Sequence, residues 1–183
     1  MRLIDTHSHL FLEEFSEDLP QVIERARSAG ITHIFMPNID STTIDSMLSV
    51  CNTYNDYCFP MIGLHPTSVN ADYEKELEIV ARELRSFNKY IAIGEVGMDL
   101  YWDKTFLKEQ QIVLDKQINW ALEYDLPVVI HCRDAFGYIY NVLEPYKNTS
   151  LKGVFHSFTG TDDEAARILE FSGFLIGING VVT

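Results

Sequence analysis

Short apolar runs rich in β-branched residues alternate along the chain with stretches in which apolar residues return every three or four positions. The first pattern is typical of buried strands and the second of amphipathic helices. Seven strands are expected, at Leu3–Ile4, Ile31–Met36, Phe59–Leu64, Tyr90–Glu95, Pro127–His131, Gly153–His156 and Phe174–Ile178. A helix is expected after each of the first six, and this alternation predicts a parallel sheet.

Most strand runs are apolar on both faces, as in sheets that are covered on both sides. They repeat at roughly 25–35 residues, the length of strand–helix–strand units. Two architectures satisfy this pattern, an open doubly wound sheet and a (β/α)8 barrel. No glycine-rich phosphate loop follows the first strand, which disfavours the dinucleotide-binding version of the open sheet. Nothing marks a linker, so residues 1–183 are expected to form one domain.

The composition is that of an ordinary globular protein, with 46% hydrophobic and 22% charged residues in 183. The formal net charge of −13 argues against a broad basic surface for nucleic acid. It leaves a phosphate substrate open, because bound divalent cations reverse the potential locally.

No apolar run reaches the length that spans a bilayer, and no signal peptide is apparent, so no membrane association is expected. The three cysteines, Cys51, Cys58 and Cys132, are odd in number and form no CxxC pair. This usage favours a reduced, intracellular protein.

Polar residues gather where the expected strands end, which is where a β/α barrel carries its functional groups. Five of the six histidines lie at such ends, in Asp5-Thr6-His7-Ser8-His9, Gly63-Leu64-His65-Pro66, His131-Cys132-Arg133 and His156-Ser157-Phe158. The exception is His33, which sits early in its strand and is expected to be structural. A carboxylate joins them in Gly94-Glu95-Val96-Gly97.

His7 and His9 are two residues apart, and such residues of an extended chain point to one face. With His131, His156 and Glu95 they supply four imidazoles and a carboxylate, a donor set that suits divalent metals. Because a carboxylate has two oxygens, Glu95 is able to bridge two ions.

The flanking polar residues leave alternatives open. His65 contacts substrate phosphate or only orders a turn. Arg133 binds phosphate bidentately, or it only pairs with Asp134 or Asp99. Asp5 is a candidate acceptor that fixes a histidine tautomer. Tyr101 and Trp102 are expected, with Asp99, in a loop after the fourth strand, where they stack on bases or simply pack.

The strand-end motifs together resemble those of the TatD-type metal-dependent deoxyribonucleases. The resemblance rests on Asp5–Leu10, Gly63–Pro66, Ile93–Asp99, Pro127–Arg133, Val154–Gly160 and Gly177–Gly180. It implies a TIM barrel and a cytoplasmic 3′–5′ exonuclease acting on DNA, expected to be single-stranded. It implies that the metal ligands are His7, His9, Glu95, His131 and His156, with His65 at the phosphate and Arg133 assisting.

One departure from the family pattern changes the expected fold. The family has a further metal-binding aspartate after an eighth strand, in a Glu-Thr-Asp-Ser-Pro-like motif. This sequence ends just past the seventh expected strand. We therefore expect a barrel truncated after strand 7, without the eighth strand and the last helices.

The expected activity is hydrolysis of DNA phosphodiester bonds by a metal-activated water, with His65 and Glu95 as catalytic residues. The expected cofactor is a pair of divalent ions (Mg, Mn or Zn), and a monomer is favoured. One alternative is an amidohydrolase-type reaction on a small-molecule amide, ester or phosphoester. Another is a binding module without catalysis.

Overall fold

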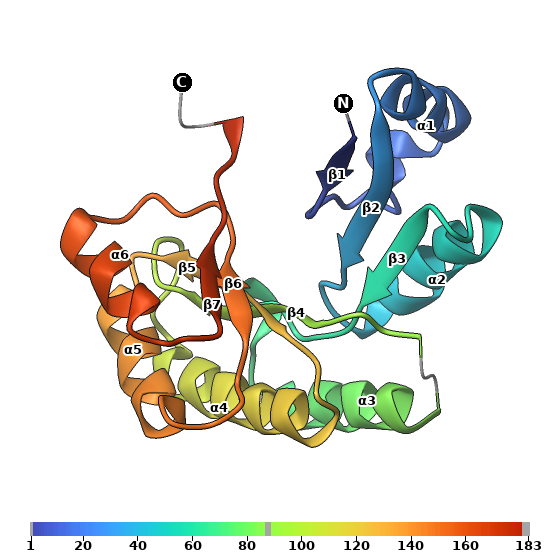
Figure 1. Cartoon of the computed structure of the whole chain (residues 1–183). Coiled ribbons are helices and arrows are strands. Elements are labelled where there is room, and N and C mark those ends of the chain that lie inside the picture. The colour runs from blue at the N-terminus through green and yellow to red at the C-terminus, as the bar shows by residue number, and fades with distance from the viewer. Residues whose placement is uncertain (1, 87–88, 181–183) are drawn as a thin grey trace.

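Seven parallel strands form one continuous series in the computed structural model, which describes residues 2–86 and 89–180 (Figure 1). They are β1 (Leu3–Asp5), β2 (Ile31–Pro37), β3 (Cys58–Met61), β4 (Ile93–Asp99), β5 (Val128–Arg133), β6 (Gly153–Phe155) and β7 (Phe174–Ile176). Strands β1–β3 and β4–β7 make two sheets, and a parallel bridge between Ile62 and Ile93 joins them. The predicted number and direction of strands are confirmed.

A helix follows each of the first six strands, as the apolar periodicity predicts. They are α1 (Leu19–Ser28), α2 (Ile44–Thr53), α3 (Tyr73–Ser86), α4 (Leu107–Glu123), α5 (Phe136–Leu143) and α6 (Asp162–Leu169). Short 3₁₀ turns lie at η1 (Glu13–Phe15), η2 (Ser41–Thr43), η3 (Pro66–Ser68) and η4 (Glu144–Tyr146). The helices lie outside the curved row of strands (Figure 1). This is the β/α architecture of a TIM barrel, and among the described residues β1 and β7 stand at the two ends of the row.

Successive residues of β5 pack into two different hydrophobic cores. Val128 and Ile130 belong to the main core, which includes the buried faces of the helices. Val129, between them, packs instead in a small cluster with Met61 and Ala92. Since successive strand residues point to opposite faces, this cluster lies inside the row of strands. His131, two residues beyond Val129, therefore faces the same interior.

The longest helix, α4, buries a stripe of apolar residues against the sheet. Val113, Leu114 and Ile118 are at most 1% exposed, and burying each such side chain stabilises the fold by about 1.5–3 kcal/mol. Two glutamines one heptad apart, Gln110 and Gln117, lie in the same buried stripe. Their amides bind the ends of two strands, as described below.

The expected position of the fourth strand is wrong by several residues. The apolar run suggested Tyr90–Glu95, whereas β4 is Ile93–Asp99 and is buried along its whole length. Its later half pairs with β5, with Gly97 opposite His131 and Asp99 opposite Arg133. Asp99 is the last residue of β4, and the side chain of Gln110 binds both its backbone N–H and its backbone carbonyl. Asp99 therefore belongs to the sheet and not to the following loop.

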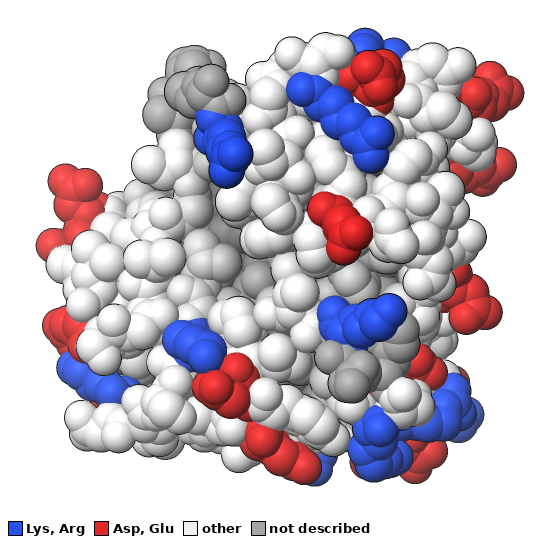
Figure 2. Space-filling view, turned by 45° about the vertical axis from the view of Figure 1, so that its right-hand side comes forward, with Lys and Arg blue, Asp and Glu red and all other residues white. Residues whose placement is uncertain are grey.

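Charged side chains of both signs are interspersed on the face shown in Figure 2, and the blue ones form no single field there. On this face the charge distribution agrees with the expectation, from the net charge of −13, that a broad basic surface is missing. Within the described part of the chain, the helices lack the length and apolar character needed to cross a bilayer.

Candidate metal centre

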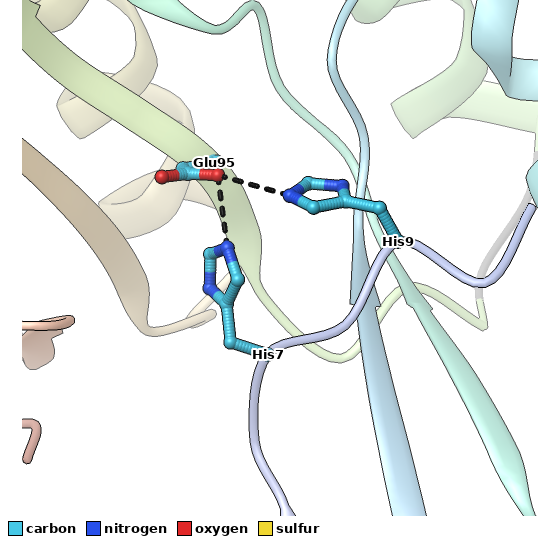
Figure 3. Close-up of side chains that lie close together, drawn as sticks. All are labelled: His7, His9 and Glu95. Atoms are coloured by element: carbon cyan, nitrogen blue, oxygen red, sulfur yellow. Dashed lines mark ion pairs between the residues drawn. The ribbon is translucent and has the colours of Figure 1, made fainter. Parts of the chain in front are cut away.

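The His7-Ser8-His9 segment brings two imidazoles to one oxygen atom of Glu95 (Figure 3). Nε2 of His7 lies 3.0 Å from Oε2, and Nε2 of His9 lies 3.5 Å from the same oxygen. The two histidines lie just past the end of β1, in irregular backbone and not in the strand itself. Their two-residue spacing nevertheless directs both rings to one point, as the sequence suggests.

The other oxygen of Glu95 faces a second set of histidines, at the ends of β5 and β6. Oε1 lies 3.0 Å from Nδ1 of His131 and 2.5 Å from Nε2 of His156. The ring of His156 also stacks on that of His7, with centroids 4.0 Å apart. Glu95, only 2% exposed, thus separates two groups of nitrogen donors, one on each oxygen.

His65 approaches the same carboxylate, but its hydrogen bonds distinguish it from the other histidines. Its Nε2 lies 3.6 Å from Oε1 of Glu95, and its Nδ1 accepts the backbone N–H of Thr67. A backbone amide can only donate, so Nδ1 carries no proton and the neutral ring is protonated at Nε2. His65 therefore presents an N–H donor to the site, which suits a contact to an anionic oxygen better than a bond to a metal.

His131 also carries a proton on Nε2, but it faces Glu95 through its other ring nitrogen, Nδ1. Its Nε2 lies 2.9 Å from Oδ2 of Asp99, and an ionised carboxylate can only accept. Nε2 is therefore protonated, and Nδ1, whose partner is the carboxylate of Glu95, donates there until it gives up its proton to a metal. Asp5, the expected orienting carboxylate, instead accepts the backbone N–H of His7 at 3.1 Å. The assignment of a tautomer-fixing role to Asp5 is wrong, and Asp99 has that geometry.

The charges of these groups are coupled. Burial raises the pKa of Glu95, but hydrogen bonds with His131, His156, His65 and His7 outweigh it and hold the pKa far below its usual range. Burial lowers the pKa of His131, yet the carboxylates of Glu95 and Asp99 outweigh burial and leave it raised. Burial dominates at His7, whose pKa is lowered. Glu95 is thus an anion, and His7 remains neutral, as a metal ligand must be.

Helix α4 holds two strand ends of this centre through its buried glutamines. Oε1 of Gln117 accepts the N–H of Leu64 at 2.7 Å, and its Nε2 donates to the carbonyl of Leu64. Oε1 of Gln110 accepts the N–H of Asp99 at 2.9 Å, and its Nε2 donates to the carbonyl of Asp99. Helix α4 therefore fixes the backbone of Leu64, next to His65, and the backbone of Asp99, whose carboxylate contacts His131.

Arg133 lies outside this cluster. Its guanidinium stacks 3.8 Å above the ring centroid of Tyr101 and 5.2 Å from that of Trp102. No ion pair joins it to Asp134 or Asp99 within the described residues, so that simple pairing alternative is wrong. Tyr101 and Trp102 are 53% and 72% exposed, so aromatic surface lies at the rim of the site beside a cation.

A cysteine nucleophile is disfavoured. Cys132 follows His131 directly, but burial raises the pKa of its thiol to about 11. The thiolate is the reactive form, and it is scarce at neutral pH with such a pKa.

The donor set fits divalent metals. Ligand atoms of His7, His9 and Glu95 lie within 4.8 Å of one another, and so do those of His65, Glu95 and His131. Imidazole and carboxylate suit Zn, Mn, Fe and Ni. The second group includes His65, but its Nε2 proton makes His156, on the same oxygen, the better candidate beside His131. Two donor groups about one carboxylate suggest a binuclear site.

Comparison with known proteins agrees with this geometry. The family described as TatD related DNase matches residues 4–183. The chain belongs to the TatD family. It is thus a metal-dependent hydrolase by family, and the expected family and fold class are both confirmed.

Individual TatD-family relatives match nearly the whole chain. An uncharacterized metal-dependent hydrolase, YabD of Bacillus subtilis, is 34% identical over 181 residues, which cover 99% of this chain and 70% of that protein. The 3′-5′ ssDNA/RNA exonuclease TatD of Pantoea ananatis is 30% identical over 180 residues, covering 98% and 68%. The crystal structure of YjjV, a TatD homologue from Escherichia coli, superimposes with a TM-score of 0.88 at 32% identity, covering all of this chain and 70% of that one.

Sequence reasoning named the histidines and Glu95 of this TatD-family centre but missed three residues behind them. The sequence pattern places Asp99 in a loop and does not distinguish Gln110 and Gln117 from other helix residues. A signal for the glutamines was present, because two amides one heptad apart interrupt the apolar stripe of α4. Buried polar side chains are almost always hydrogen-bonded, so such an interruption indicates partners in the sheet.

Proposed function

We propose that this protein hydrolyses phosphodiester bonds of single-stranded DNA from the 3′ end, with two divalent ions bound about Glu95. The observation that carries the proposal is the division of donors, in which each oxygen of Glu95 faces its own pair of histidines. We assign His7 and His9 to one ion, His131 and His156 to the other, and Glu95 to both.

The bound metals, when present, supply an activated water and neutralise charge on the phosphate. The chain's own residues orient the reactants. The anionic Glu95 fixes the separation of the two histidine groups. His65 donates its Nε2 proton in a hydrogen bond to a phosphate oxygen, where negative charge grows as the water oxygen bonds to phosphorus and the bond to the 3′ oxygen breaks. The departing 3′ oxygen takes up the proton that the water gives up.

The substrate class rests on the rim of the site and on the relatives. Exposed Tyr101 and Trp102 offer faces on which unstacked bases can stack, each worth about 1–3 kcal/mol. Arg133, held against Tyr101, places a cation beside them for a phosphate. One relative is named a 3′-5′ ssDNA/RNA exonuclease, so RNA is a competing substrate to be compared with DNA.

The test is hydrolysis of a single-stranded oligonucleotide, labelled at its 5′ end, by the purified chain with Mg, Mn or Zn added. We expect a ladder that shortens from the 3′ end. Glu95→Gln should lower the rate by orders of magnitude, and His65→Ala by about 10²–10³-fold, because each removes stabilisation of the reacting phosphate. His33→Gln is the matched control, since His33 stacks on Phe59 in β3 and contacts no residue of the centre.

Two results would contradict the proposal. One is no cleavage with any of the three metals while the metals do bind. The other is cleavage that Glu95→Gln leaves at the original rate. Internal cleavage in place of a ladder would retain the phosphodiesterase and reject the exonuclease.

The alternative of a small-molecule amide, ester or phosphoester substrate is separated by a panel of such compounds without nucleic acid. A rate on any of them above that on the oligonucleotide would favour it. We also propose a cytoplasmic location and a monomer. The location is supported by free thiols at Cys51, Cys58 and Cys132, as expected in a reducing compartment.

A further inference from the structure

A cavity of about 630 Å³ opens beside the metal centre, between the ends of β5 and β6 and the helices α5 and α6 that follow them. Its size is within the range of about 300–1,000 Å³ that holds small organic ligands. His156, which contacts Glu95, forms part of its wall. The cavity therefore adjoins the metal centre at His156.

The wall combines aromatic faces with a few fixed polar groups. Phe136 and Tyr138 come from α5, and Phe158 follows β6. Arg167 of α6 is held in position, with its guanidinium 3.6 Å above the ring of Tyr140 and 5.7 Å from that of Phe136. Aromatic walls with a small number of positioned polar groups are typical of sites that orient a flat organic ligand.

The charges on the wall disfavour a phosphate inside the cavity. The acidic side chains Asp134 and Glu164 accompany the single cation Arg167. Two carboxylates repel a phosphate, whereas carboxylate and amide groups such as Asn141 can bind hydroxyls and the N–H edges of bases. The wall chemistry thus fits an uncharged, hydrogen-bonding aromatic group.

The backbone beside the cavity also has an unusual conformation, at Asp134, which lines it, and at Ser157, which lies between the lining residues His156 and Phe158. Asp134 and Ser157 have φ of 52° and 51°, in the left-handed region that side chains rarely adopt. Each follows shortly after a histidine of the metal centre. Such conformations cost of order 1 kcal/mol or more and cluster at ligand sites, where the surrounding structure maintains them.

We propose that this cavity binds the nucleoside part of the nucleotide whose phosphate lies at the metal centre, with its base between the aromatic walls. The inference rests on the proposed function, since it assigns the terminal nucleoside of that same substrate. A metal centre that contacts only the phosphate does not distinguish a chain end from an internal position. A cavity of limited size does, because only a terminal nucleoside fits into it.

Gly137 provides the test, because it lines the cavity and a Cβ at this position would meet no atom within 4 Å. It lies four residues before Asn141 on the same face of α5, and Asn141 also lines the cavity. Larger side chains at position 137 should therefore occupy the space without touching the metal centre. Ser49→Leu is the matched control, since it adds a leucine at an exposed position of α2, away from α5 (Figure 1).

The measurement is calorimetric binding of thymidine 5′-monophosphate and of inorganic phosphate to the full chain, with Mn added and without it. We expect the nucleotide to bind at least about tenfold more tightly than phosphate. Gly137→Leu should abolish this preference, Gly137→Ala should reduce it less, and Ser49→Leu should leave it unchanged. Asn141→Phe, which fills the same space from the next turn, should act like Gly137→Leu, and circular dichroism verifies that each variant is folded.

The proposal is overturned if the nucleotide binds no more tightly than phosphate, or if folded Gly137→Leu and Asn141→Phe keep the preference. These outcomes are distinct from failure of the proposed function. A protein that prefers the nucleotide in this assay but cleaves no oligonucleotide would retain the subsite and lose the nuclease. A protein that cleaves oligonucleotides but does not prefer the nucleotide over phosphate would retain the nuclease and lose the subsite.

Discussion

His131 is held between two carboxylates, with Nδ1 3.0 Å from Oε1 of Glu95 and Nε2 2.9 Å from Oδ2 of Asp99. The two contacts have different meanings. Asp99 holds a proton on Nε2, so Nδ1 is the nitrogen that would lose its proton and bind a metal. Outer carboxylates of this kind orient ligand histidines and raise their basicity.

Asp99→Asn should weaken metal binding by about 10–100-fold. Oδ2 of Asp99 accepts from His131 and Oδ1 accepts the N–H of Tyr101 at 3.1 Å, so two donors need two acceptor atoms. An asparagine has one acceptor oxygen and must face one donor with its own NH₂ group. The measurement is a calorimetric titration with Zn or Mn.

Asp103→Asn is the control, because Asp103 is exposed and its carboxylate accepts hydrogen bonds from Thr105 and Lys104 in the same loop. Equal metal affinity in folded Asp99→Asn and in the unsubstituted protein would remove the orienting role. NMR of the His131 ring nitrogens gives a second readout, since the proton should leave Nε2 for a mixture of tautomers in the variant.

Metal affinity should fall as the pH is lowered from about 8 to about 5.5, and His131 should be the group that limits it. Burial lowers its pKa, but Glu95 and Asp99 raise it more, so the net pKa is raised. A raised pKa means that the proton is bound already at higher pH and competes with the metal there. His7, whose pKa burial lowers, stays neutral over more of this range.

Calorimetry in two buffers of different ionisation enthalpy checks this, because metal binding near neutral pH should release protons. NMR titration of the metal-free protein should show His131 protonating before His7 as the pH falls. The reverse order, or an affinity independent of pH, would contradict the assignment.

The sequence predicted the parts of this protein that depend on local pattern. The strands, the helices, Glu95 and the five histidines around it are predictable because apolar periodicity and strand-end position are both local features. The end of β4 was not found, since burial of Asp99 depends on Gln110, eleven residues later, and on a histidine in β5. The stacking of Arg133 on Tyr101 is not predictable from the sequence either. Two carboxylates, Asp134 and Asp99, are also candidate partners, and the sequence does not show which group lies closest to the guanidinium.

Gln117→Leu should lower the free energy of unfolding by about 2–4 kcal/mol. Leu64 is fully buried, and the glutamine satisfies both its N–H and its carbonyl, so the substitution leaves two buried groups unpaired. Urea unfolding followed by circular dichroism measures the change. Gln111→Leu, at a half-buried position of the same helix, is the control and should change stability by no more than about 0.5 kcal/mol.

Because Leu64 precedes His65, the same substitution should also affect the centre. We expect folded Gln117→Leu to lose activity in addition to stability, whereas Gln111→Leu keeps both. A stability loss in Gln117→Leu below about 0.5 kcal/mol would show that water or a backbone shift replaces the amide.

Gly97→Ala should prevent stable folding, because β4 and β5 approach each other at Gly97 with no room for a side chain. Gly97 has φ of +137°, and a Cβ there would lie 2.0 Å from the carbonyl oxygen of His131. Relief requires the strands to separate, which would displace His131 from Glu95. For such backbone conflicts we expect the free energy of unfolding to fall by more than about 4 kcal/mol.

Gly137→Ala is the matched substitution at an open helical position and should stabilise the protein by about 0.5–1 kcal/mol. Thermal unfolding of the two variants compares them directly. Similar midpoints would mean that β4 and β5 can move apart at little cost, and the close approach that sets the spacing of the metal centre would then not depend on glycine.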